Sequence, residues 1–290
     1  MSRIGLSVTN REIEAGILEV MQKIGYTDVD YSLLDEYDVP PVIFSKDHDV
    51  WAEHYLNRKK LFASYGLSVA QVHATFCTDF DQSGAVTDTI IRQFEKEIEV
   101  TAILGAKYIV IHPIVLRVAT VQKEKEYALN LQLYQSLTPT LKKFGVKLAI
   151  ENMYAHDYVR MRYTHTAASS TPQDTLAYLQ QLDPTCFTAC LDTGHANMLN
   201  IAPDAFVRQL GSRLGVLHVN DNNGIRDEHN VPYMGNIDWV AFVKALKEVG
   251  FDGVFCIEQA TAKFMDTPKG VGEEYLRYAY NTCKVILGEK

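Results

Sequence analysis

Residues 145–152 read GVKLAIEN, which is a glycine followed by a short apolar run and a glutamate. Gly145 can end a helix, because glycine readily adopts the positive φ angles found just past a helix's last turn. The run that follows predicts a buried strand over Lys147–Glu151. A charged side chain at the end of such a strand costs free energy unless it is hydrogen-bonded, ion-paired or bound to a metal. Glu151 is therefore a candidate functional residue.

The same alternation of helix and strand recurs along the whole chain. Segments of helical period are predicted at Val86–Leu104, Lys123–Phe144, Asp174–Leu182 and Trp239–Val249. Strands are predicted at Ile4–Val8, Thr27–Tyr31, Ser68–His73, Tyr108–His112, Lys147–Glu151, Thr188–Asp192, Gly215–His218 and Val254–Glu258. Strands that alternate with helices form a parallel sheet, and eight such units in 290 residues favour a closed (β/α)8 TIM barrel. An open doubly wound sheet is the main alternative, but no GxGxxG or Walker loop follows the first strand.

The chain shows no internal boundary. No linker rich in proline, glycine and serine divides it, so residues 1–290 are predicted to form a single domain. A short stretch of small residues, Thr164–Ser170, is interpreted as a loop over the mouth of the barrel. It ends where Ser170 or Thr171 can cap a helix that has Pro172 in its first turn.

Six of the predicted strands end in a histidine, glutamate or aspartate. The strand ends read QVHA, VIHP, AIEN, CLDT, LHVN and CIEQ, and their polar residues are His73, His112, Glu151, Asp192, His218 and Glu258. Successive members are separated by 39, 39, 41, 26 and 40 residues. The carboxyl ends of barrel strands converge on one rim, so these side chains are expected to lie together. Such a set predicts metal binding or acid–base catalysis.

Composition narrows the class of protein. No apolar run approaches the roughly 20 residues needed to span a bilayer, and no membrane association is expected. The five cysteines form no CxxC pair, which favours a reducing cytoplasm. The net charge is −8, and no basic stripe for neutralising phosphates is visible, so nucleic acid is an unlikely partner and a small molecule is favoured.

Two local motifs extend the polar rim. The segment CLDTGHANM (190–198) places His195 three residues after Asp192, across a turn in which Gly194 gives conformational freedom. His195 can then face the barrel mouth or simply cap or pack. The segment from His218 to Trp239 carries Arg226, Asp227 and His229 in a loop rich in glycine and asparagine. That cluster can clamp a substrate's carboxylate, phosphate or hydroxyl, or can be an ordinary solvated loop.

Glu151 and Glu258 suggest a reaction. If both bind one metal together with Asp192 and His218, each carboxylate can still face a bound substrate, which suits two-base proton transfer beside a carbonyl. A metal bridging the carbonyl and the adjacent hydroxyl would acidify the intervening C–H and hold the enediolate. Three carboxylates and one imidazole suit Mn²⁺, Mg²⁺ or Co²⁺, with Mn²⁺ preferred here, whereas additional histidines would favour Zn²⁺.

The pieces VHA, IHP, IEN, LDTGH, HVND, RDEH and GNIDW together resemble the xylose-isomerase-like TIM-barrel superfamily, and within it the sugar phosphate isomerase/epimerase group. The resemblance covers nearly the whole chain. It implies one divalent metal held by Glu151, Asp192, His218 and Glu258, with the two glutamates carrying the proton transfers. It also implies that Arg226 contacts the substrate, which would be a sugar, keto-sugar or cyclitol.

The same pieces are similar to endonuclease IV, a related family that holds three zinc ions with nine ligands. Every ligand type is present, at His73, His112, Glu151, Asp192, His195, His218, Asp227, His229 and Glu258. Two features argue against a nuclease: the acidic charge suits DNA poorly, and NVPYM replaces the Gly-Glu-rich turn of the endonucleases before GNI. His73, His112, His195, Arg226, Asp227 and His229 are therefore predicted to hold either a second metal or the substrate.

The expected function is a metal-dependent sugar or cyclitol isomerase or epimerase. Two alternatives stay open: a zinc phosphodiesterase at abasic DNA, and a dehydratase or lyase subunit that acts on keto-sugars with a partner chain. A homo-oligomer is compatible with the sequence. The loops Tyr31–Ser45 and Tyr154–Ser170 are expected to shape the pocket and so to decide the substrate.

Overall fold

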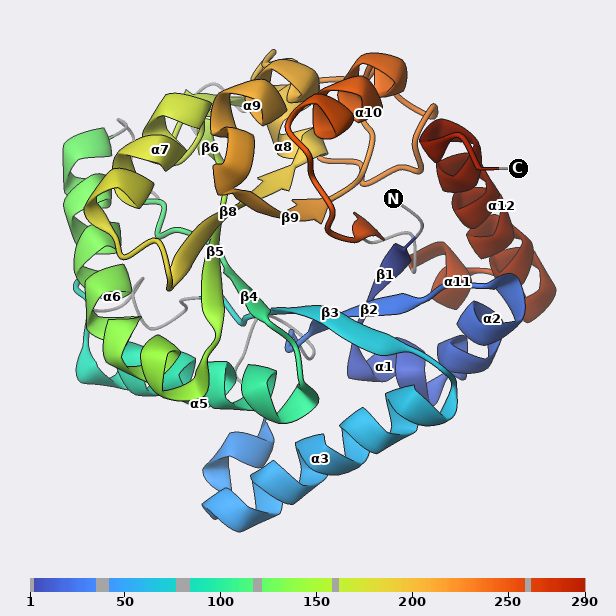
Figure 1. The fold of residues 1–290 in the computed structure, drawn as a ribbon, viewed down its shortest axis with the longest axis horizontal. Helices are drawn as coiled ribbons and strands as arrows, with labels where there is room; N and C mark the ends of the chain where they lie inside the picture. Colours follow the sequence, from blue (N-terminus) through green and yellow to red (C-terminus); the bar gives the residue numbers. More distant parts are fainter. Residues whose placement is uncertain are drawn as a thin grey trace.

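The computed structural model describes residues 3–34, 42–76, 84–116, 122–157, 162–258 and 262–289. Eight parallel strands lie in the order β10-β1-β2-β3-β4-β5-β8-β9 and are ringed by helices (Figure 1). The first and last strands of this order also meet: the Val219 amide donates to the Cys256 carbonyl at 2.8 Å, and the Glu258 amide donates to the Val219 carbonyl at 3.0 Å. These bonds bring the two edges together, and the predicted (β/α)8 barrel is confirmed.

The barrel strands start and end within one residue of the predicted bounds. They are β1 (Ile4–Val8), β2 (Asp28–Ser32), β3 (Ser68–His73), β4 (Tyr108–Ile111), β5 (Lys147–Glu151), β8 (Phe187–Asp192), β9 (Leu214–His218) and β10 (Phe255–Ile257). Two polar residues predicted to be the last of a strand, His112 and Glu258, follow it by one position instead.

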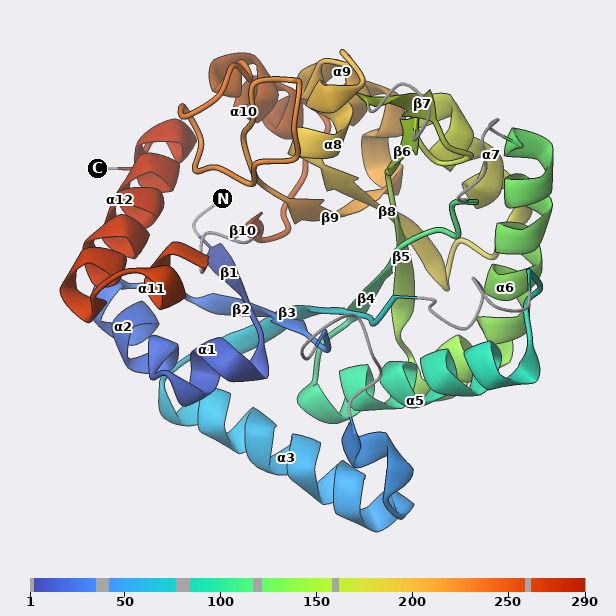
Figure 2. The same ribbon diagram turned by 180° about the vertical axis from the view of Figure 1, so that it is seen from behind.

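The helices cover the outside of the barrel in both views (Figures 1 and 2). They are α1 (Asn10–Glu14), α2 (Ile17–Ile24), α3 (His48–Ser64), α5 (Asp88–Leu104), α6 (Lys123–Phe144), α7 (Pro172–Gln181), α8 (Thr193–Met198), α9 (Pro203–Leu210), α10 (Trp239–Glu248), α11 (Ala262–Asp266) and α12 (Lys269–Leu287). The start of α7 is as predicted, with Thr171 capping the Asp174 amide and Pro172 in the first turn. Within the described ranges, no helix is long and apolar enough to cross a membrane.

One predicted loop is partly a β-hairpin. Strands β6 (Tyr154–Asp157) and β7 (Arg162–Thr166) pair antiparallel, with Tyr154 opposite Thr166. The interpretation of Thr164–Ser170 as loop is therefore wrong for its first three residues. The sequence RYTHT of β7 is rich in β-branched and aromatic residues, which favour a strand once a pairing partner lies nearby.

Side-chain alternation along the strands gives the barrel two apolar layers. Large residues such as Ile109 and Ile150 belong to the main core between the sheet and the helices. A separate small cluster fills the barrel itself and consists of Val110, Ala149, Cys190 and Val216. Because side chains two positions apart share a face, the next residues on this inner face are His112, Glu151, Asp192 and His218. The candidate site therefore rests on an apolar floor.

Candidate metal centre at the barrel mouth

Four polar residues from four strands meet at the carboxyl end of the barrel. Glu151, Asp192, His218 and Glu258 are all buried, and each offers a ligand atom within 4.8 Å of those of the others. Nδ1 of His218 lies 3.3 Å from Oε1 of Glu151 and 3.6 Å from Oε2 of Glu258. The structure thus brings together the four residues named as metal ligands, and their binding of a metal stays a prediction.

The chemistry of this cluster fits a divalent cation. Both carboxylate oxygens of Glu151 and the Nδ1 atom of His218 are buried without a hydrogen-bond partner among the described residues. Leaving such groups unsatisfied costs about 1–3 kcal/mol each. Burial, with the neighbouring carboxylates of Asp192 and Glu151, raises the pKa of Glu258 to about 8 against the opposing effect of His218 and His229. A cation held among three carboxylates and an imidazole would satisfy these atoms and offset the repulsion.

Two asparagines hold Asp192 in place. Asn152 accepts a hydrogen bond from the Asp192 amide at 2.7 Å and donates to the Asp192 carbonyl at 3.0 Å. Asn220 donates from Nδ2 to Oδ2 of Asp192 at 2.7 Å. Oδ1 of Asp192 caps helix α8 by accepting from the His195 amide at 2.7 Å. Sequence reasoning missed both asparagines, although Asn152 directly follows Glu151 and Asn220 comes two positions after His218.

His73 and His112 lie on the other side of Glu151. Nε2 of His112 is 3.1 Å from Oε2 of Glu151, and Nε2 of His73 is 3.2 Å from Nε2 of His112. Nδ1 of His73 lies 2.8 Å from the Ala74 carbonyl and can donate to it, so that Nε2 carries the lone pair. Burial and the neighbouring His112 lower the pKa of His73 to about 4. A neutral His73 can therefore accept a substrate hydroxyl's hydrogen bond or bind a cation together with Glu151 and His218.

His195, Asp227 and His229 form a third group with ligand atoms within 4.8 Å of one another. Oδ2 of Asp227 lies 3.4 Å from Nε2 of His195 and 3.1 Å from Nε2 of His229. The Tyr154 hydroxyl donates to the same oxygen at 3.1 Å. Although burial opposes ionisation, the two histidines hold the pKa of Asp227 well below its usual range. His195 thus faces the mouth, and its Nδ1 lies 2.9 Å from the Asn152 carbonyl.

The loop that carries Asp227 and His229 is organised by a buried aspartate. Asp221 accepts hydrogen bonds from the Tyr233 amide and from Nε1 of Trp239, both at 2.9 Å. It thereby ties the two ends of the β9–α10 loop, which Figure 2 shows in full beside β9. Sequence reasoning did not single out Asp221. Arg226 is exposed on this loop, and no described hydrogen bond or ion pair includes it, so its contact with substrate stays a prediction.

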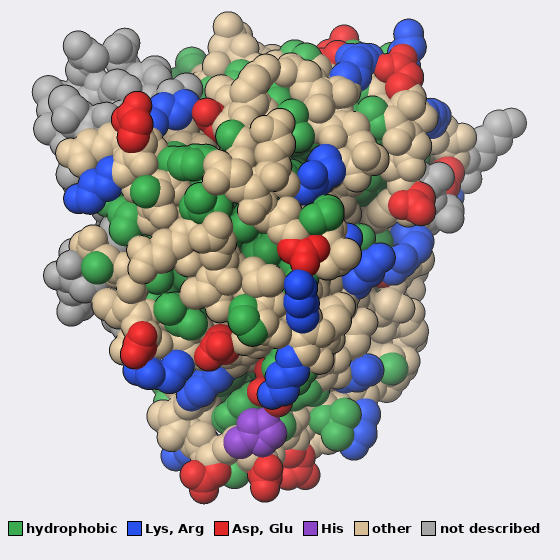
Figure 3. Space-filling model, turned by 60° about the vertical axis from the view of Figure 1, so that its left-hand side comes forward, with side chains coloured by type: hydrophobic (Ala, Val, Ile, Leu, Met, Phe, Trp, Pro, Cys, Tyr) green, Lys and Arg blue, Asp and Glu red, His purple; other side chains and the backbone are tan. Residues whose placement is uncertain are grey.

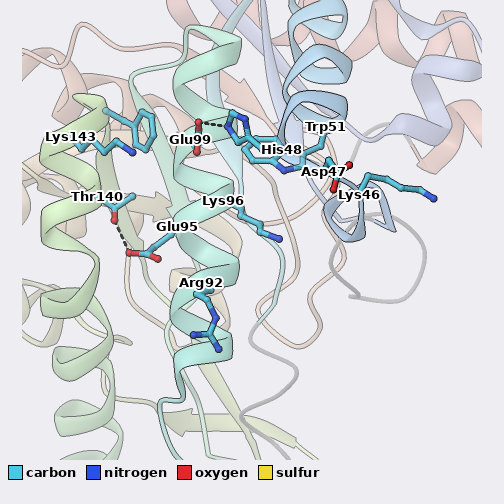
Figure 4. Close-up of a pocket in the computed structure, with 11 residues that line it drawn as sticks. Lys46, Asp47, His48, Trp51, Arg92, Glu95, Lys96, Glu99, Thr140 and Lys143 are labelled. Atoms are coloured by element: carbon cyan, nitrogen blue, oxygen red, sulfur yellow. Dashed lines mark hydrogen bonds and ion pairs between the residues drawn. The ribbon is translucent and has the colours of Figure 1, made fainter.

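A second concavity lies away from the mouth. It is a surface pocket of about 560 Å³ between α3, α5 and α6 (Figure 4), lined by Lys46, Asp47, His48, Trp51, Arg92, Glu95, Lys96, Glu99, Thr140, Lys143 and Phe144. Within it, His48 contacts Glu99 at 2.9 Å, and the Thr140 hydroxyl donates to Glu95 at 2.8 Å. None of the rim residues lines it, and it takes no part in the proposed chemistry.

Comparison with known proteins identifies a family and several relatives of the chain. The sequence profile of the family described as "Xylose isomerase-like TIM barrel" matches residues 18–279. An uncharacterized protein of Methanocaldococcus jannaschii is 31% identical over 150 residues, which make up 51% of this chain and 48% of that protein. The inosose isomerase of Bacillus velezensis is 22% identical over 282 residues, or 94% of this chain and 91% of that enzyme. The D-psicose 3-epimerase of Ruminiclostridium cellulolyticum is 25% identical over 139 residues, which make up 48% of this chain and 43% of that enzyme. The chain thus matches about half the length of two of these relatives and nearly all of the inosose isomerase.

Solved structures share the fold. A D-psicose 3-epimerase solved in the presence of D-fructose has a TM-score of 0.72 and 15% identity, covering 98% of this chain and 99% of that one. The IolI protein, solved with a bound zinc atom, has a TM-score of 0.72 and 19% identity, covering 98% of each chain. At these identities the likeness establishes the fold, and chemistry has to be argued from the side chains.

Proposed function

The chain belongs to the xylose isomerase-like TIM-barrel family, and from the side chains at its barrel mouth we propose that it is a divalent-metal-dependent isomerase or epimerase. The substrate is a sugar, keto-sugar or cyclitol. The observation that carries the proposal is the convergence of Glu151, Asp192, His218 and Glu258, with ligand atoms within 4.8 Å of one another. The inosose isomerase and D-psicose 3-epimerase matches support this substrate class.

In this proposal the two glutamates move the protons. Glu151 and Glu258 come from strands β5 and β10, which are separated by β8 and β9, so they approach the cluster from different sides. One carboxylate removes the proton from the carbon beside the carbonyl. The other returns a proton to the opposite face of that carbon in an epimerase, or to the neighbouring carbon in an isomerase. When bound, a divalent cation supplies charge that polarises the carbonyl and stabilises the enediolate.

The remaining rim residues hold the substrate in this proposal. His73 and His112 lie beside Oε2 of Glu151, whereas His195 lies 3.5 Å from Oε1 of Glu151 and 3.4 Å from Asp227, so hydroxyls on both sides of Glu151 can be bound. Arg226 would reach the substrate from the β9–α10 loop. The donor set favours Mn²⁺, with Co²⁺ or Mg²⁺ as alternatives, while the zinc atom in the IolI structure supports Zn²⁺.

A zinc phosphodiesterase is the second candidate, because one specific observation favours it. His195, Asp227 and His229 could hold a further cation, and His73, Glu151 and His218 another. The charge of the protein argues against a nuclease. The net charge is −8, and acidic and basic side chains are interspersed on the face shown in Figure 3 instead of forming a basic stripe. One bound ion per chain would support the sugar enzyme; three zinc ions with nicking of abasic duplex DNA would support the nuclease.

Solvent exchange tests the proposed reaction. The purified, Mn²⁺-loaded protein is incubated in D₂O with D-psicose, D-tagatose, D-fructose, L-ribulose and inosose, and the products are examined by NMR and mass spectrometry. We expect deuterium to enter at the carbon beside the carbonyl of at least one substrate. A product lighter by one water would instead indicate the dehydratase alternative.

Variants then assign the proton transfers. With metal kept saturating, Glu258→Gln and Glu151→Gln are expected to lower the exchange rate by about 10²–10⁴-fold, since an amide cannot take up the proton. Glu274→Gln, exposed on the outer helix α12, serves as the matched control and is expected to behave as the wild type. Unchanged exchange in Glu258→Gln, on a substrate that the wild type turns over, would overturn the assigned role.

Cellular location and assembly are further parts of the proposal. We place the enzyme in the cytoplasm, and the support is that Cys186, Cys190, Cys256 and Cys283 are free and buried. Cys77 lies outside the described residues. Assembly with a second copy of the chain is compatible with the fold, and size measurement in solution would decide it.

A further inference from the structure

We propose that Asp30 is a positioning residue for His218: it holds the imidazole in the tautomer that offers Nδ1 to the cation. The inference rests on the metal centre proposed above and concerns a residue outside the four ligands. Asp30 lies in the middle of strand β2 and is completely buried. A buried carboxylate is costly without a partner, and the partner that this one faces is the ring of His218.

The two nitrogens of His218 face different surroundings. Nδ1 is directed at the ligand cluster, 3.3 Å from Oε1 of Glu151 and 3.6 Å from Oε2 of Glu258. Nε2 lies 3.2 Å from Oδ2 of Asp30. A neutral imidazole carries its proton on only one nitrogen, and that nitrogen cannot bind a metal. A carboxylate next to Nε2 stabilises the proton there, and the lone pair is then left on Nδ1.

The strand register places Asp30 at this position. The pairing of β2 with β3 shifts between Val29 and Asp30, so Val29 lies opposite Val69 whereas Asp30 lies opposite Gln71. Such irregularities re-aim side chains at barrel rims. Nε2 of Gln71 donates to Oδ2 of Asp30 at 3.1 Å and lies 3.4 Å from the carbonyl of Leu217, the residue before His218. Gln71 thereby fixes Asp30 relative to the strand that carries the histidine.

The effect of removing Asp30 on metal affinity can be estimated. Residues that orient a metal-binding histidine typically contribute 10–100-fold to metal affinity. The competing explanation is that Asp30 only stabilises the fold. Asp28 provides a matched control, because it is also a completely buried aspartate on β2 but pairs with Arg3 instead of with the site.

The test measures Mn²⁺ and Zn²⁺ binding to chelator-stripped protein by titration calorimetry. We expect Asp30→Ala to bind Mn²⁺ about 10–100-fold more weakly than the wild type. Asp30→Asn should lose less, because its amide oxygen can still accept the Nε2 proton. Asp28→Asn can lower the unfolding midpoint but should leave the affinity within a factor of about three. Circular dichroism establishes that each variant is folded.

A second readout does not depend on metal. Nitrogen-15 NMR of the metal-free protein, recorded at a pH high enough to leave the imidazole neutral and with the His218 signal identified through His218→Gln, reports which ring nitrogen carries the proton. The wild type should show Nε2 protonated, and Asp30→Ala should show a shift toward the other tautomer. Wild-type affinity and tautomer in Asp30→Ala would overturn the inference while leaving the metal centre intact. Failure of the wild type to bind any divalent cation would instead refute the metal centre, and the tautomer would still decide the role of Asp30.

Discussion

A buried glutamate on helix α5 should make the protein less stable as the pH rises. Glu97 has no exposed surface, and its carboxyl group accepts hydrogen bonds from the amide and hydroxyl of Thr75 and from Gln93. Thr75 is the second residue after His73, so Glu97 holds the start of a loop at the barrel mouth. Burial raises the pKa of Glu97 from 4.5 to about 7, although the hydrogen bonds from Thr75 and Gln93 act in the opposite direction.

The sign and size of the effect follow from proton linkage. Below about pH 4.5 the carboxyl group is protonated in both the folded and the unfolded chain, and it contributes no slope. Between about pH 4.5 and 7 the folded state keeps a proton that the unfolded state has lost, so the free energy of unfolding falls as pH rises. The two pKa values differ by about 2.5, which corresponds to a loss of about 3 kcal/mol by pH 8.

Urea unfolding of the wild type and of Glu97→Gln, followed by circular dichroism from pH 4 to 8, isolates this contribution. Glutamine keeps the shape of the protonated acid but cannot ionise. The variant should match the wild type near pH 4 and become more stable than it by about 3 kcal/mol near pH 8. Glu95→Gln, on the same helix but partly exposed, removes no buried charge and should follow the wild-type profile. Parallel profiles for wild type and Glu97→Gln would refute the reasoning.

Two further substitutions test how the mouth is built. Asp221→Asn replaces an acceptor oxygen with an NH₂ group that faces backbone amides and Nε1 of Trp239. We therefore expect the free energy of unfolding to fall by about 1–3 kcal/mol and the Tyr233 amide to exchange its hydrogen faster. Unchanged exchange at Tyr233 would show that Asp221 does not order the loop. Gly194→Ala would place its Cβ 1.9 Å from Oδ1 of Asn220, so we expect a lower unfolding midpoint and weaker Mn²⁺ binding. Gly270→Ala, whose Cβ would meet nothing within 4 Å, should be neutral or slightly stabilising, and equal effects of the two alanines would contradict the steric argument.

The fold and the polar rim could be predicted because their signals are local. Buried strands are short apolar runs, and the glycines that precede several of them end helices with positive φ, as at Gly105 (82°) and Gly145 (67°). Each strand could therefore be bounded within one residue. The polar residues at the strand ends stand out against those apolar runs, and barrel topology alone is enough to place them on one rim.

The supporting residues could not be found in this way, because their partners come from other strands. Asp30 lies beside His218 because the pairing of β2 with β3 shifts by one residue, and neither strand's sequence predicts that shift. Asn220 and Asp221 look like ordinary loop residues until the barrel brings Asp192 and Trp239 beside them. The hairpin of β6 and β7 likewise depends on pairing between two segments that are individually too short to predict.

A crystal structure of the Mn²⁺-loaded protein, with diffraction recorded at the manganese absorption edge, tests the central claim most directly. Anomalous scattering locates the ion independently of the surrounding atoms. We predict a peak bonded to Glu151, Asp192, His218 and Glu258, with Nδ1 as the ligand atom of His218. An absence of any peak among these four residues in crystals grown with saturating Mn²⁺, or a peak bound only elsewhere on the protein, would contradict it.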